Sequence, residues 1–155
     1  MRAAIIGALV MGALAAGAPA AGEVLHFRAV LTGAAETPPN VGRGTGLAEI
    51  TLDTDSRMLA WRVTYAGLTG PVTGAHFRTP PEPGSALGST MDFARPLVSP
   101  ILSSARLNDI EIGDLRAGLW SVNLLTAKYP AGEIRGDLER VPATPSAMAR
   151  APRTR

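Results

Sequence analysis

The sequence predicts an all-β fold: an antiparallel β-sandwich of seven or eight strands, with an immunoglobulin-like or superoxide-dismutase-like Greek-key order. Several short segments alternate apolar and polar residues with period two, and no long segment has the 3.6-residue period of a helix. The 155 residues also include 17 glycines and 13 prolines, a density of turn-forming residues typical of short-stranded β proteins. About 120 residues remain once both ends are set aside, enough for one domain with a core.

Six segments carry the alternation, and residues 59–65 show it most clearly because Leu59, Trp61, Val63 and Tyr65 share one face. In chain order the predicted strands are residues 25–31, 48–53, 59–65, 73–78, 120–125 and 133–138. Turn residues cluster between them at 37–40, 53–56, 67–71 and 128–132, and residues 55–58 are short enough to close a hairpin. Residues 79–104 are predicted to form a long crossover or loop. Residues 109–118 are predicted to hold one helical turn that ends at Gly118.

The two ends of the chain differ from this pattern. Residues 1–20 have the order of a signal peptide: a basic Arg2, an apolar stretch, and the small-x-small motif Ala18-Pro19-Ala20. An uncleaved anchor is the alternative, because residues 3–22 form an uncharged run. We therefore expect a secreted or periplasmic domain at residues 21–141, with no membrane span after cleavage. Residues 142–155 are predicted to form a flexible tail.

Composition excludes several classes of function. The chain has no cysteine, which excludes disulfides, thiolate metal sites and a thiol nucleophile. Its formal charge is +2, but four of its 15 basic residues lie in the two ends: Arg2, Arg150, Arg153 and Arg155. Acidic residues therefore outnumber basic ones in the body, which has no basic cluster for binding nucleic acid.

Three stretches, in order, resemble the chordin (CHRD) domain family over about Val24–Leu138. Residues 27–39 (FRAVLTGAAETPP) are similar to its opening, residues 67–77 (GLTGPVTGAHF) to its centre, and residues 115–136, which end in GEIRG, to its last strands. The resemblance implies a small secreted β-sandwich of the kind found in chordin-type and exported bacterial proteins. The family's biochemical activity is largely undefined.

The chain departs from the family at two histidines. Members commonly carry His-x-His in the central strand and a third histidine after the later asparagine. Here His76 is kept, but Arg78 and Leu125 occupy the other two positions. We therefore expect no metal site and no cofactor, because one imidazole beside a fixed cation is a poor metal ligand set. Histidines restored at positions 78 and 125 are predicted to converge with His76 on one ion.

A polar cluster is the remaining candidate site. His76 and Arg78 share one strand face, and Asn123, Glu133 and Arg135 lie on the polar phase of two later strands. These five residues are predicted to bind an anion or a small polar ligand if their strands are neighbours. The alternative is that they form ordinary pairs that stabilise the sheet. No residue is assigned a catalytic role, because no serine stands in a nucleophile motif.

These observations predict a binding or structural module that interacts with an unidentified protein or envelope component. The alternative function is a copper- or zinc-dependent β-sandwich protein, or a superoxide-dismutase-like enzyme, that uses His76. The small number of histidines in the chain favours the first hypothesis.

Overall fold

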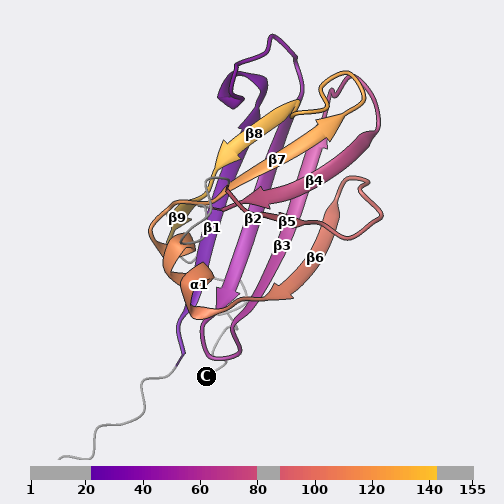
Figure 1. Cartoon of the computed structure of the whole chain (residues 1–155). Helices are drawn as coiled ribbons and strands as arrows, with labels where there is room; N and C mark the ends of the chain where they lie inside the picture. Colours follow the sequence, from indigo (N-terminus) through magenta and orange to yellow (C-terminus); the bar gives the residue numbers. More distant parts are fainter. Residues whose placement is uncertain (1–21, 80–87, 143–155) are drawn as a thin grey trace, which may run out of the picture.

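The computed structural model describes residues 22–79 and 88–142 (Figure 1). The predicted signal peptide and almost all of the predicted tail lie outside these residues. Along the chain the elements are β1 (Val24–Thr32), the short 3-10 helix η1 (Gly33–Ala35), β2 (Thr45–Asp53), β3 (Met58–Ala66), β4 (Val72–Arg78), β5 (Thr90–Asp92), β6 (Ile101–Arg106), α1 (Asp109–Arg116), β7 (Ser121–Thr126), β8 (Ile134–Asp137) and β9 (Glu139–Val141). No helix in the described part of the chain is long and apolar enough to cross a membrane.

The strands form one antiparallel sheet that curls on itself. Eight of them follow the order β5-β4-β7-β8-β1-β2-β3-β6, and β9 pairs with β1 beyond the end of β8. The curl places β4 and β5 opposite β3 (Figure 1), where the ring of Trp61 lies 5.1 Å from Phe77 and 5.0 Å from Phe93. The predicted antiparallel β-sandwich is confirmed, and the described residues form nine strands where seven or eight were predicted.

The core lies between the two halves of the curled sheet. The strand phases read from the alternation are correct for the two tryptophans: Trp120 is fully buried and Trp61 is 5% exposed. Alternation within the predicted strand 73–78 would place Thr73 on the same face as Ala75 and Phe77, but Thr73 is exposed. The register between β4 and β7 shifts between Val72 and Gly74, so this irregularity turns Thr73 outward while Val72 is buried.

The hairpin predicted at residues 55–58 joins β2 and β3. Nine residue pairs run from Asp53 opposite Met58 to Thr45 opposite Ala66. The Asp53 carboxylate accepts hydrogen bonds from the backbone N–H groups of Asp55 (2.9 Å) and Ser56 (3.2 Å), which holds the turn. These bonds lower the pKa of the Asp53 carboxyl.

The prediction of a loop over residues 79–104 is wrong in two places. β5 pairs with β4, and β6 begins within this range and pairs with β3, so both strands lie at the edges of the sheet. Alternation did not reveal β5 because it has only three residues. In β6, Ile101 is buried while its neighbour Leu102 is 65% exposed, which leaves little apolar alternation.

The helical turn predicted before Gly118 is the two-turn helix α1. Asn108 and Glu111 form a capping box: the Asn108 side chain accepts from the Glu111 N–H at 2.9 Å, and the Glu111 carboxylate accepts from the Asn108 N–H at 2.8 Å. Gly118 follows the end of the helix, as predicted. Its φ of +74° is a backbone conformation that favours glycine.

Candidate functional site

A row of directly opposed polar residues crosses the outer face of β5, β4, β7 and β8. The register pairs His76 with Asp92 on one side and with Asn123 on the other, and it pairs Asn123 with Arg135. Directly opposed residues have Cβ atoms about 4.5–5.5 Å apart, so these side chains are neighbours on one face. Phe77, the next residue after His76, is fully buried on the inner face. Three of the five predicted site residues therefore lie together.

Arg78 lies beside this row. It stands two residues along β4 from His76 and opposite Ser121, so its side chain is on the same face. Arg135 lies 3.4 Å from the carboxylate of Asp137. Arg78 is exposed, and no hydrogen bond or ion pair joins its guanidinium to any of residues 22–79 or 88–142. Arg78 is thus the cation of this face that remains available to a ligand.

A fifth polar group, Glu36, joins the face from the loop after η1. Its N–H donates to the carbonyl of Gly33 at 3.2 Å, and the residue is only 8% exposed. Burial raises the pKa of the Glu36 carboxyl, although the charges of Arg135 and Arg78 and the N–H of Thr37 act in the opposite direction. Alternation could not find Glu36 because it lies in a turn. Its only signal is the Glu-x-Pro-Pro motif.

Gly132 allows Glu36 and Asn123 to approach each other. A Cβ atom on Gly132 would stand 2.5 Å from Glu36 Oε1 and 2.5 Å from Asn123 Oδ1, so the two oxygens are at most twice that distance apart. Gly132 also has a φ of +146°, which other residues rarely adopt. A side chain at this position would separate the loop that carries Glu36 from β7.

Three buried polar atoms of this face have no hydrogen-bond partner: Glu36 Oε1, Asn123 Oδ1 and His76 Nε2. Leaving a buried polar atom unpaired costs about 1–3 kcal/mol, and native structures contain few such atoms. Three of them on one face are typical of a place where a ligand or water supplies the missing partner. We define Glu36, His76, Arg78, Asn123 and Arg135 as the polar face.

The surroundings of His76 favour its uncharged form. Its side chain is 12% exposed, and its Nδ1 lies 4.0 Å from the Asp92 carboxylate. Burial lowers the pKa of the imidazole. Asp92 acts to raise that pKa, and the positive charge of Arg78 adds to the lowering. A neutral imidazole has one N–H donor and one acceptor nitrogen, so His76 can contact either kind of ligand group.

Glu133, predicted to belong with the other four residues, lies in a separate cluster. It is fully buried, and its carboxylate accepts from Thr126 Oγ1 (2.6 Å), Thr69 Oγ1 (2.7 Å) and the Thr69 N–H (2.8 Å). Its carbonyl accepts from Asn40 Nδ2 at 2.9 Å. Burial alone would raise the pKa of Glu133, but the hydrogen bonds from Thr126 and Thr69 outweigh it and lower the pKa. Glu133 therefore joins the loops around Asn40 and Thr69 to the end of β7.

Comparison with known families agrees with these motifs. A family model for the CHRD domain matches residues 27–138, which include the whole polar face. The chain belongs to the CHRD family. CHRD domains are typical of extracellular proteins, and the family suggests a binding or structural module. Comparison with curated proteins and with solved structures found no match.

The register separates the three positions at which CHRD members commonly carry histidine. Leu125 lies opposite Gly74, and Arg78 lies opposite Ser121, so Leu125 and Arg78 stand on opposite sides of His76. Four residues of strand at about 3.3 Å each separate them. This spacing argues against the prediction that histidines at 78 and 125 would converge with His76 on one ion. Residues 22–79 and 88–142 contain no group of three or more His, Cys, Asp or Glu that could hold a metal ion.

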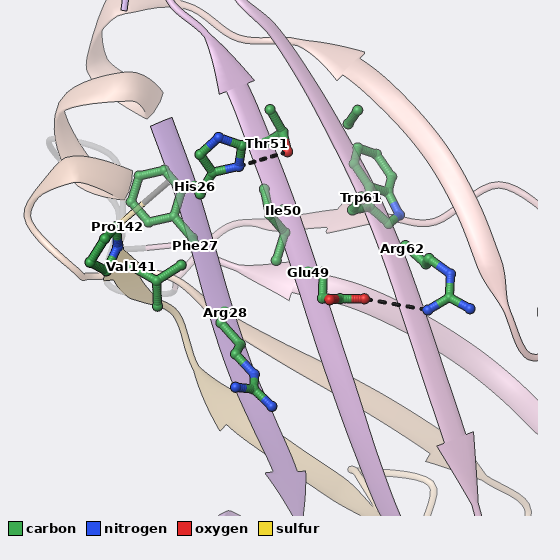
Figure 2. A pocket seen from close by; sticks show the side chains of 11 residues that line it. His26, Phe27, Arg28, Glu49, Ile50, Thr51, Trp61, Arg62, Val141 and Pro142 are labelled. Carbon is green, nitrogen blue, oxygen red and sulfur yellow. Dashed lines mark hydrogen bonds and ion pairs between the residues drawn. The ribbon is translucent and has the colours of Figure 1, made fainter. Parts of the chain in front are cut away.

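A hollow of about 890 Å³ lies over β1, β2 and β3 (Figure 2), and no residue of the polar face lines it. Its polar side chains are largely paired with one another. Arg62 lies 3.3 Å from Glu49, and Thr51 Oγ1 lies 3.4 Å from the imidazole of His26. Apart from the exposed Arg28, these groups already pair with each other, so the hollow is a weaker candidate than the polar face, despite its size.

Proposed function

We propose that this chain is an exported binding module of the CHRD family and that it binds a protein or an envelope component through the polar face. The unpaired buried atoms Glu36 Oε1, Asn123 Oδ1 and His76 Nε2 carry this proposal. They are a cost to the free protein that a partner with matching polar groups would remove. Export is inferred from residues 1–20, which have the order of a signal peptide.

The chemistry of the polar face favours binding over catalysis. Its members are two arginines, a carboxyl group, an amide and one imidazole. None of these residues gives the imidazole a hydroxyl group to activate as a covalent nucleophile. The charge of Arg78 also acts against a cation at His76, so the copper or zinc alternative gains no support from the neighbours of His76.

Retention of an envelope component on immobilised protein tests this function. Wild type and two variants are loaded with the same envelope extract: Arg78→Ala on the polar face and Arg62→Ala, another exposed arginine that lies outside it. We expect wild type and Arg62→Ala to retain the same component and Arg78→Ala to retain at least tenfold less. Equal retention by all three folded proteins would contradict the proposed site.

A further inference from the structure

Glu36 Oε1 and Asn123 Oδ1 form a pair of acceptors that lacks a donor. The assignment of the Asn123 amide is settled by its other end, because Nδ2 donates to the carbonyl of Ala131 at 3.1 Å. The atom that approaches Gly132 and Glu36 is therefore the amide oxygen. Two buried oxygens that both accept repel each other unless a donor stands between them. When Glu36 is ionised, neither oxygen can donate, so the missing group is one that supplies the hydrogen atoms.

The surrounding charges select the kind of donor. An ammonium group or metal ion would meet the positive field of Arg78 and Arg135, both of which act on Glu36. A hydroxyl group donates without carrying charge and meets no such opposition. Arg78 has a free guanidinium on the same face, and a guanidinium binds a carboxylate with two parallel hydrogen bonds. His76 Nε2, also unpaired, can contact a second hydroxyl.

On the basis of the proposed function, we propose that the polar face binds a hydroxylated organic anion, with a hydroxyl donating to Glu36 and Asn123 and a carboxylate held by Arg78. Glu36 Oε1 and Asn123 Oδ1 are covered in the free protein. Among the described groups, only the N–H of Thr37 is a hydrogen-bond donor to the Glu36 carboxylate, which leaves Oε1 open to a hydroxyl of the ligand. The hydroxyl then takes the position between the two acceptors.

Two sources share this chemistry: a free hydroxy acid, and a uronic acid unit of an envelope polysaccharide. An NMR titration of the ¹⁵N-labelled protein separates them, with the Arg78 Nε–H and the Gly132 amide as reporters. The probes are D-galacturonate, lactate, D-galactose, which lacks the carboxylate, and acetate, which lacks the hydroxyl. We expect galacturonate to shift both reporters to saturation and to bind at least tenfold more tightly than galactose or acetate.

Binding of galacturonate without lactate identifies the polysaccharide unit as the source, and equal binding of lactate identifies the free acid. Glu36→Gln should weaken binding at least tenfold, because its amide can donate to Asn123 and close the site. Glu49→Gln, a carboxylate on the far half of the sheet, should leave binding unchanged. Saturation by neither acid, or equal binding of galactose or acetate, would overturn this ligand class.

The two proposals fail in different ways. If the wild-type protein retains an envelope component in an Arg78-dependent manner but neither hydroxy acid binds, only the ligand class is wrong. If Arg78→Ala has no effect on retention, the polar face is not the binding site and the proposed function is wrong with it.

Discussion

Glu36 is the residue at which folding and the proposed binding conflict. Folding raises the pKa of its carboxyl group above the ordinary value of 4.5. Between pH 4.5 and the folded pKa, the folded state therefore binds more protons than the unfolded state. The free energy of unfolding therefore falls as the pH rises through this interval. We expect Glu36→Gln to be at least as stable as wild type at pH 7, with an advantage that grows as the pH rises above 4.5.

Urea unfolding at several pH values measures this advantage. Glu49→Gln, which removes a carboxylate from an exposed ion pair with Arg62, is the control and should change stability by less than about 1 kcal/mol. A Glu36→Gln protein that is clearly less stable than wild type at pH 7 would show that the carboxylate is a structural group.

Trp61 and Trp120 are the two largest side chains of the core, and both pack against Phe77, with ring centroids at 5.1 and 5.4 Å. Trp61→Ala and Trp120→Ala should each lower the free energy of unfolding by about 3–5 kcal/mol, because each leaves a cavity in a packed interior. Leu102→Ala, at a position 65% exposed on β6, should change it by no more than about 0.5 kcal/mol. Unfolding midpoints equal to wild type for both tryptophan variants would contradict the described core.

At the scale of elements, Glu133 joins three segments through one carboxylate. Glu133→Ala removes the acceptor of the Thr69 N–H and of the hydroxyls of Thr69 and Thr126. Hydrogen bonds to charged groups contribute about 1.5–3 kcal/mol each, so we expect a loss of at least about 3 kcal/mol at pH 7. Because folding lowers the pKa of Glu133, its contribution is complete above pH 4.5 and declines as the pH falls through the folded pKa.

The penalty of Glu133→Ala should therefore shrink on acidification, in contrast to the behaviour expected of Glu36. Denaturant unfolding of this variant and wild type at pH 7 and at pH 3 measures the change. A penalty that does not depend on pH would mean that the neutral carboxyl group holds the loops equally well.

The sequence predicted four of the five members of the polar face, but not how the strands that carry them are arranged. Period-two alternation places His76 and Arg78 on one side of their strand and Asn123 on the polar side of another. It carries no information about which strands are neighbours, and the pairing of β4 with β7 joins residues far apart in the chain. Glu133 was misplaced because it lies just before β8 begins at Ile134, and its carboxylate is bound by Thr69 and Thr126, which alternation does not reveal.

For the whole molecule, the alternation and the turn residues were sufficient to predict an antiparallel sandwich, since inner faces such as that of β1 are apolar at every second position. The edge strand β5 was missed because it is very short, and the edge strand β6 was missed because only its first residue is buried. The order of the strands could not be predicted from the sequence. It depends on how the sheet curls, which involves long-range contacts such as that between Trp61 and Phe93.

The two halves of the curled sheet present different outer faces, and the central claim is that binding uses the half formed by β5, β4, β7 and β8. Amide hydrogen exchange, measured with and without the retained envelope component, tests it most directly. We predict slower exchange in the loops at residues 33–44 and 127–133, which flank the polar face, and no change at residues 26–28, 49–51 and 60–62. Protection confined to those last segments, over the hollow on β1, β2 and β3, would contradict the claim.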